Sequence, residues 1–248
     1  MTLPALKAML GAQSSWTPES LPSLVAWWDA DDAGSFTFGS GSEVASWASQ
    51  VGSYSLVQTT SSKRPSRSAT VGGRSAVAFG SDDALSVASF DMGAGEKASL
   101  WVVAAMPVGG DRVLVEHSPN TNSYAGAFLA YRNGTTNNAD CYRRAGVAAT
   151  WQSTDTWSTT PKAAIFTIDG TLTTDEVSGW LNGSSAGKRP SNNNTSGSNR
   201  IDTLYVGARG GTSLYLNGTI AEIGISTAVF APSEIMALNA YLAAKWSL

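Results

Sequence analysis

The last third of the chain reads AAIFTI (Ala163–Ile168), VSGWLNG (Val177–Gly183), TLYVGA (Thr203–Ala208), TIAEIGI (Thr219–Ile225) and PSEIMALNAYLAAKWSL (Pro232–Leu248). The first four segments are short runs rich in β-branched and aromatic residues, and turn-forming residues lie between them, which is the pattern of β-strands. The fifth segment has the apolar spacing of a helix. This stretch therefore predicts an all-β fold with a single C-terminal helix.

Further runs of strand length precede this stretch. They are Leu24–Asp29, Ser75–Phe79, Ser99–Met106, Arg112–Glu116 and Tyr124–Tyr131. Strands at such short spacing predict two antiparallel sheets packed as a β-sandwich of the jelly-roll type. We expect the third and fourth of these strands to pair with each other through Gly109-Gly110.

The chain divides into an N-terminal arm, residues 1–22, and one domain, residues 23–248. Within the domain, Asn182-Gly183 predicts a tight hairpin, because a type I′ turn needs positive φ at both central residues. The terminal helix is amphipathic, and its apolar stripe is predicted to pack on the sandwich. The residues of the stripe are Ile235, Leu238 and Leu242, with Tyr241 and Trp246 at its border.

Composition excludes several classes of function. The 248 residues are 42% hydrophobic, which supports a sizeable core, and only 14% charged, with a net charge of −3. No basic stripe is present, so nucleic-acid binding is not expected. The apolar runs are too short for a membrane span. Cys141 is the only cysteine, which rules out an intrachain disulfide and a thiolate metal cluster. The N-terminus does not have the pattern of a signal peptide.

Five segments carry a resemblance to a known family. They are Leu24–Asp32 (LVAWWDADD), Ser75–Leu85 (SAVAFGSDDAL), Gly179–Gly183 (GWLNG), Leu204–Arg209 (LYVGAR) and Asn217–Ile225 (NGTIAEIGI). In their order and spacing, these segments resemble a concanavalin-A-like, laminin-G-type jelly-roll domain over residues 24–248. Within that family, the chain is most similar to lectin-like minor tail proteins of phages that infect actinobacteria. The resemblance implies a two-sheet sandwich that binds glycans or protein partners.

Many members of this family carry calcium at the rim of a sheet, so the resemblance also implies a possible calcium site. The candidate ligands are Asp82 and Asp83, and a second acidic cluster comprises Asp29, Asp31 and Asp32. Calcium prefers several hard oxygen ligands, which clustered aspartates can supply. The alternative is a set of solvated turn carboxylates, since aspartate favours turns. No other cofactor is expected.

The sequence argues against an enzyme. Retaining glycosidases of this fold need two carboxylates on one strand face, and Glu222 has no carboxylate two positions away. His117 is the only histidine, and no G-x-S-x-G motif accompanies it. We therefore expect His117 to be a strand-end or loop residue.

The segment from Tyr131 to Trp157 combines aromatic rings with planar polar groups, as sugar-binding sites do. The candidate ligand-binding residues are Tyr131, Arg132, Tyr142, Arg143, Trp151 and Trp157. The alternatives are a protein interface, where Tyr, Trp and Arg are enriched, and simple packing. We assign four tryptophans to packing and expect Trp180 to be half exposed; the four are Trp27, Trp47, Trp101 and Trp246.

These observations favour a non-enzymatic, lectin-like virion protein of a phage tail or capsid that binds bacterial surface carbohydrate. The N-terminal arm would attach it to other virion proteins. The alternative is a purely structural virion protein that binds only such proteins. By analogy with symmetric phage appendages, self-association into a homo-oligomer is also an expectation.

Overall fold

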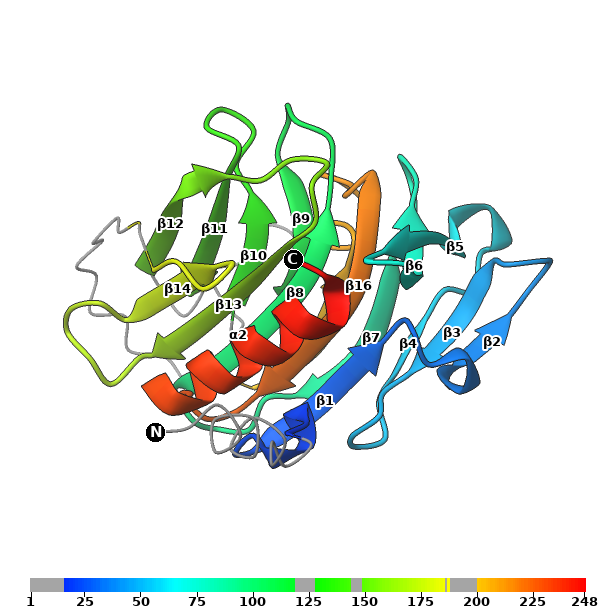
Figure 1. Cartoon of the computed structure of the whole chain (residues 1–248). Coiled ribbons are helices and arrows are strands. Elements are labelled where there is room, and N and C mark those ends of the chain that lie inside the picture. The colour runs from blue at the N-terminus through cyan, green and yellow to red at the C-terminus, as the bar shows by residue number, and fades with distance from the viewer. Residues whose placement is uncertain (1–15, 119–127, 144–148, 186, 188–199) are drawn as a thin grey trace, which may run out of the picture.

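The computed structural model describes residues 16–118, 128–143, 149–185, 187 and 200–248. In this part of the chain, two antiparallel sheets face each other, and the helix α2 (Pro232–Trp246) lies across the outer face of one of them (Figure 1). The predicted all-β sandwich with a C-terminal helix is confirmed.

The first sheet has seven strands, in the order β14-β13-β8-β16-β6-β5, and β1 also pairs with β16. Its strands are β1 (Leu24–Asp29), β5 (Ser66–Val71), β6 (Arg74–Phe79), β8 (Lys97–Ala105), β13 (Lys162–Asp169), β14 (Val177–Leu181) and β16 (Gly218–Ser226).

The second sheet has nine strands, in the order β12-β11-β10-β9-β15-β7-β4-β3-β2. Its strands are β2 (Phe36–Phe38), β3 (Val44–Ala48), β4 (Ser55–Val57), β7 (Leu85–Asp91), β9 (Arg112–His117), β10 (Phe128–Arg132), β11 (Asn138–Arg143), β12 (Ala149–Thr156) and β15 (Ile201–Val206). Three short 3-10 turns lie at Pro18–Ser20, Ala33–Ser35 and Ser61–Lys63.

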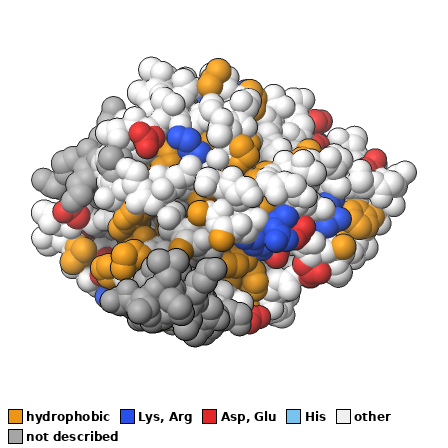
Figure 2. All heavy atoms as spheres, in the orientation of Figure 1, with side chains coloured by type: hydrophobic (Ala, Val, Ile, Leu, Met, Phe, Trp, Pro, Cys, Tyr) orange, Lys and Arg blue, Asp and Glu red, His pale blue; other side chains and the backbone are white. Residues whose placement is uncertain are grey.

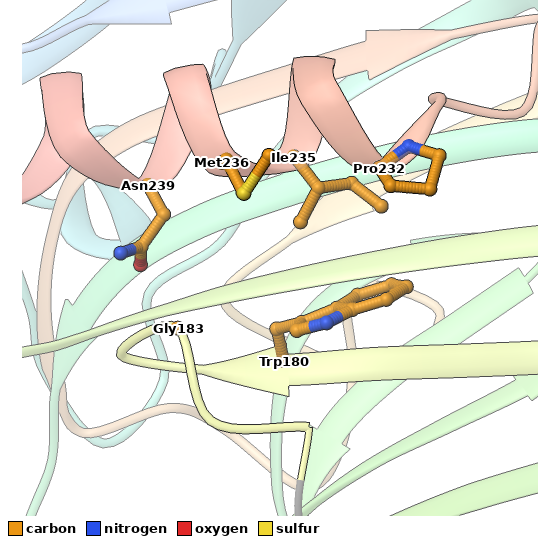
Figure 3. A pocket seen from close by; sticks show the side chains of 6 residues that line it. All are labelled: Trp180, Gly183, Pro232, Ile235, Met236 and Asn239. Carbon is orange, nitrogen blue, oxygen red and sulfur yellow. The ribbon is translucent and has the colours of Figure 1, made fainter.

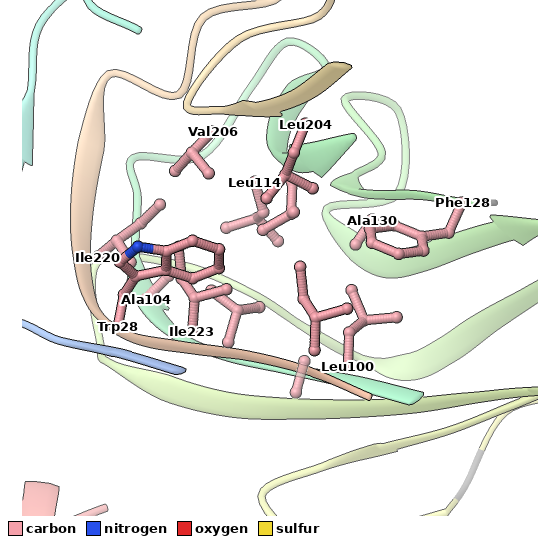
Figure 4. Packing of buried hydrophobic residues seen from close by; sticks show 14 of the residues in the cluster. Trp28, Leu100, Ala104, Leu114, Phe128, Ala130, Leu204, Val206, Ile220 and Ile223 are labelled. Carbon is pink, nitrogen blue, oxygen red and sulfur yellow. The ribbon is translucent and has the colours of Figure 1, made fainter. Parts of the chain in front are cut away.

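Strand β8 shows why a nearly continuous apolar run forms here. Successive side chains of a strand point to opposite faces of the sheet. Leu100 enters the core between the two sheets (Figure 4), and Val102 belongs to the same cluster, whereas Trp101 and Val103 join a second cluster beneath α2. Because both faces of β8 are covered, both sets of side chains are buried.

The helix packs as its spacing predicts. Ile235, Leu238 and Leu242 are buried against the seven-stranded sheet. Trp246, which we expected at the border of the stripe, is fully buried within it. Its indole N–H reaches the sheet, where it donates to Glu222 Oε2 over 2.8 Å. None of the described helices is long and apolar enough to cross a membrane.

The predicted pairing of β8 with β9 is wrong. Strand β8 pairs with β13 and β16 in one sheet, and β9 pairs with β10 and β15 in the other. The segment with Gly109 and Gly110, both at positive φ, therefore carries the chain from one sheet to the other. A local turn signal does not distinguish a hairpin from a crossover, because both reverse the chain direction.

Most of the predicted arm lies outside the described residues, which begin at Trp16. The described remainder packs on the domain: Trp16 contacts Tyr241 with ring centroids 5.6 Å apart, and Leu21 is buried in the cluster beneath α2. The division of the chain at residue 22 stays a prediction, as does the role of the arm.

Candidate functional site

Part of the predicted aromatic cluster lies on the outer face of the nine-stranded sheet. In the strand register, Tyr131 lies opposite Asp140, and Asp140 lies opposite Gln152, so these three side chains share one face. Tyr142 lies two residues further along β11, on the same face. Tyr131 donates a hydrogen bond from its hydroxyl to that of Tyr142 over 3.0 Å, and the ring centroids are 5.4 Å apart.

A polar group flanks the tyrosine pair. One carboxylate oxygen of Asp140, Oδ2, accepts from Asn133 Nδ2 over 3.3 Å and from Gln152 Nε2 over 3.0 Å. Burial raises the pKa of Tyr131 far above its ordinary value, and the hydrogen bond to Tyr142 and the charge of Asp140 add to the increase. Tyr131 is therefore neutral and keeps its hydroxyl proton. We call this group the tyrosine site: Tyr131, Asn133, Asp140, Tyr142 and Gln152.

The two arginines of the predicted cluster point to the opposite, inner face. Arg132 is fully buried and donates to Asn137 Oδ1 and to the carbonyl oxygens of Gly109 and Gly110, each over 2.6 Å. Arg143 is fully buried as well, and its Nη1 lies 2.9 Å from Glu176 Oε2. These contacts hold parts of the fold together and enclose both guanidinium groups, so neither forms part of an open ligand surface.

The two tryptophans of the cluster are also in the core. Trp157 is fully buried and donates from Nε1 to the Ala104 carbonyl oxygen over 2.9 Å. Trp151 packs edge-on against Phe166 and lies directly on Gly179, where a β-carbon would come within 2.6 Å of the indole. Enclosed indoles offer no face for a sugar ring. The candidate cluster is thereby reduced to Tyr131 and Tyr142, whose ligand role stays a prediction.

The aspartates of the possible calcium site do not fit a calcium ion. Asp83 Oδ2 accepts from the Gly80 N–H over 2.6 Å, which closes a turn, and Asp82 is exposed beside it. Burial raises the pKa of Asp83; the hydrogen bond from the Gly80 N–H opposes this increase, and the charge of Asp82 adds to it. Among the described residues, no three histidine, cysteine or acidic side chains gather as metal ligands.

The second acidic cluster serves the fold. Asp29 Oδ2 lies 2.7 Å from Lys245 Nζ on α2. Asp31 forms an ion pair with Arg74 over 2.6 Å, and Asp32 accepts from Gln50 Nε2 over 2.7 Å. Burial raises the pKa of Asp31, but its bonds to Arg74 and to the Ser75 N–H outweigh this effect and hold the pKa below its ordinary value. Each carboxylate thus ties the end of β1 to a different neighbour.

A pocket that sequence reasoning did not assign as a site lies between β14 and α2. Its lining residues, shown in Figure 3, are Trp180, Gly183, Pro232, Ile235, Met236 and Asn239, and its volume is ≈ 240 Å³. We call it the Trp180 pocket. It opens on the face of the molecule that carries α2, where hydrophobic side chains reach the surface (Figure 2). The predicted half exposure of Trp180 was the one signal that pointed to this place.

The predicted hairpin turn positions one wall of this pocket. Asn182 and Gly183 have φ of +47° and +79°, and Leu181 and Ser184 exchange backbone hydrogen bonds across them, as a type I′ turn requires. The Asn182 side chain accepts from the Ala163 N–H over 2.8 Å, which fixes the turn to β13. In register, Trp180 lies opposite Ile165, so its indole is directed to the face beneath α2.

Comparisons with known proteins bear on the fold. A scan against protein-family models matches none, and no curated protein sequence matches the chain. Among solved structures, a Trypanosoma rangeli sialidase in complex with sialic acid is 13% identical with a TM-score of 0.60, over 91% of this chain and 33% of the sialidase. The carbohydrate-binding domain CBM40 of a Ruminococcus gnavus sialidase, bound to α2,3-sialyllactose, is 11% identical with a TM-score of 0.45, over 62% of this chain and 97% of that domain.

At such low identity, the likeness to the sialidase shows the fold alone. The chain spans about a third of the sialidase. The predicted lectin-like β-sandwich is thus confirmed as a fold, and what this chain binds has to be argued from its own residues.

Proposed function

We propose that this protein is a non-enzymatic, carbohydrate-binding module of the lectin-like β-sandwich class. The observation that carries the proposal is the tyrosine site, where an aromatic pair lies beside amide and carboxylate groups on the outer face of the sheet. Tyr142, Asn133 and Gln152 are partly exposed there, and Tyr131 and Asp140 are buried beneath them. An aromatic ring stacks on the apolar side of a pyranose, and fixed planar groups bond its hydroxyls. A solved structure with a similar fold is a sialidase described in complex with sialic acid, which is consistent with such a use of the fold.

A finer proposal follows from the resemblance of the sequence to lectin-like minor tail proteins. We propose that the module is displayed on a phage particle, on the tail or the capsid surface, and that it adheres to the surface polysaccharide of an actinobacterial host. Residues 1–22 would attach it to other virion proteins. The low charge of the chain, 14% of its residues, supports a particle protein whose solubility rests on Ser, Thr, Asn and Gly.

Binding to isolated polysaccharide tests the proposal. Purified protein is titrated against cell-wall polysaccharides from actinobacteria, and Tyr142→Ala is compared with Phe38→Ala, which removes an exposed ring from β2 at the far end of the same sheet. We expect saturable binding that weakens about tenfold, near 1.4 kcal/mol, in Tyr142→Ala and stays unchanged in Phe38→Ala.

Two results would count against the proposal. Equal loss in both variants would show a general effect on the fold and not a role for Tyr142. Absence of binding by well-folded protein across the polysaccharide panel would favour the alternative, a structural virion protein that binds only its neighbours.

A further inference from the structure

The Trp180 pocket lies on the opposite sheet from the tyrosine site and has a different character. Its walls come from two elements that are far apart in sequence, the hairpin after β14 and the first turns of α2 (Figure 3). Apolar surface is contributed by Pro232, Ile235 and Met236, and Met236 is 68% exposed. An exposed methionine beside a half-buried indole leaves apolar surface available for a ligand.

Two polar groups in the pocket are free to bond a ligand. Within the part of the chain that the structure describes, neither the Trp180 indole N–H nor the Asn239 side-chain amide forms a hydrogen bond, and both residues are partly exposed. Asn239 Nδ2 lies over Gly183, where a β-carbon would come within 2.7 Å of it, and the φ of +79° at this position also favours glycine. Together the two side chains offer donors and one carbonyl acceptor.

The lining residues also restrict the charge of a ligand. None of the six is ionisable, so the pocket presents no ammonium or guanidinium group for a carboxylate or phosphate, and no carboxylate for an amine. A volume of ≈ 240 Å³ lies just below the usual range of small-molecule sites, roughly 300–1,000 Å³, and so suits one ring better than a chain of rings.

We propose that the Trp180 pocket is a second binding site, distinct from the tyrosine site, for a single neutral pyranose unit. The apolar face of the sugar ring would lie on the Trp180 indole. Its hydroxyl groups would bond the Trp180 N–H and the Asn239 amide. The absence of a cation among the lining residues selects neutral hexoses over sialic or uronic acids.

Nuclear magnetic resonance tests this proposal with defined probes. Saturation-transfer spectra are recorded with the methyl pyranosides of glucose, galactose, mannose and N-acetylglucosamine, and with N-acetylneuraminic acid and glucuronic acid as anionic probes. We expect at least one neutral probe to bind with a Kd in the millimolar range, on the order of 4 kcal/mol, as a single-ring ligand in a shallow pocket should. The anionic probes should give no saturable signal.

Variants assign the signal to the pocket. Trp180→Ala should weaken binding about tenfold, while Trp180→Phe, which keeps an aromatic face, should retain most of it. Asn239→Ala should weaken binding with an unchanged unfolding midpoint, because the amide forms no hydrogen bond within the described chain. Phe38→Ala, which removes an exposed ring that belongs to neither site, is the matched control and should leave hexose binding unchanged.

The outcomes separate this site from the proposed function. No binding of any neutral probe, preferential binding of an anionic probe, or full binding by Trp180→Ala would each overturn the inference. Loss of hexose binding in Tyr142→Ala with full binding in Trp180→Ala would assign the sugar to the tyrosine site alone. Retained hexose binding at Trp180 without binding of polysaccharide would overturn the proposed adhesion to host polysaccharide through the tyrosine site and leave the pocket assignment intact.

Discussion

At the scale of single residues, His117 shows how one buried group sets a pH response. It ends β9, as expected for a strand-end residue, and its ring lies between Phe90 and Phe128 with both centroids 6.0 Å away. Its Nε2 donates to the Phe90 carbonyl oxygen over 3.1 Å. Burial lowers the pKa of His117 below its ordinary value, because the enclosed site disfavours the charged ring.

The lowered pKa of His117 predicts acid sensitivity. Between the folded pKa and the unfolded value of about 6.5, the unfolded chain binds more protons than the folded one, so stability rises with pH in that window. We therefore expect the free energy of unfolding to fall as pH decreases below about 6.5. Urea unfolding at a series of pH values measures this free energy. Since His117 is the only histidine, His117→Gln should flatten the curve between about pH 5.5 and 7.5. An unchanged slope in the variant would contradict this account.

At the scale of elements, a buried carboxylate fastens α2 to the seven-stranded sheet. Glu222, fully buried on β16, accepts from the indole N–H groups of three tryptophans and from Lys245 Nζ over 2.8 Å. The donors are Trp27 at 3.0 Å, Trp101 at 3.2 Å and Trp246 at 2.8 Å. Lys245 also pairs with Asp29 and lies over aromatic rings, 4.8 Å from the Trp246 centroid. One helix residue thus connects two strands through a nearly enclosed ion pair.

Removal of the ammonium group should loosen this attachment. Lys245→Met leaves Glu222 as a buried carboxylate without its cation, and we expect a loss of about 3 kcal/mol in the free energy of unfolding at neutral pH. Burial already raises the pKa of Glu222, and the loss of Lys245 raises it further. When the pKa of a carboxyl group is higher in the folded than in the unfolded state, the free energy of unfolding decreases as the pH rises above the unfolded-state pKa.

The destabilisation by Lys245→Met should therefore be smaller near about pH 5 than near about pH 7.5, which urea titrations at the two values measure. The double variant Glu222→Gln/Lys245→Met is the control, because it removes both charges. It should be more stable than Lys245→Met alone at the higher pH. If the single and double variants lose the same stability at both pH values, the ion pair is not what fastens the helix.

At the scale of the whole molecule, a second buried ion pair joins the two sheets. Arg143 ends β11 in the nine-stranded sheet, and Glu176 immediately precedes β14 in the other sheet. Both side chains are 1% exposed. The guanidinium lies against Gly170, where a β-carbon would come within 2.1 Å of it, so the close approach depends on glycine at this position.

Breaking one side of this pair should destabilise the entire sandwich. Glu176→Gln removes the carboxylate that lies 2.9 Å from the buried Arg143 guanidinium, and we expect a loss of about 3 kcal/mol. Replacing both partners by apolar residues, in Arg143→Met/Glu176→Leu, should recover part of that loss. Thermal and urea unfolding, followed by tryptophan fluorescence, measure the stability of the single and the double variant. If the double variant is less stable than Glu176→Gln, the prediction is wrong. The attraction between the two charges would then stabilise the contact between the sheets more than apolar packing can.

The accuracy of the predictions made from the sequence differs between elements. The strand runs and the Asn182-Gly183 turn are local signals, and the structure confirms β1, β14, the turn and the helix within a few residues. The pairing of β8 with β9 is a non-local property, and the turn between them did not reveal that they belong to different sheets. Four of the six candidate site residues were misplaced for a related reason, because Arg132, Arg143, Trp151 and Trp157 have the right chemistry for sugar binding and lie on the inner side of the sheet. The ligand role of Tyr131 and Tyr142 stays a prediction.

The sequence by itself determined the class of fold, the amphipathic helix and the burial of most tryptophans, because alternation, helical spacing and turn chemistry are properties of neighbouring residues. Only the tertiary structure decided which face of each strand is open. It also brought Trp180 beside Asn239, Glu222 beside Lys245, and Arg143 beside Glu176. These contacts join residues from different elements, so their geometry is set by how the sheets and the helix pack and not by any local pattern.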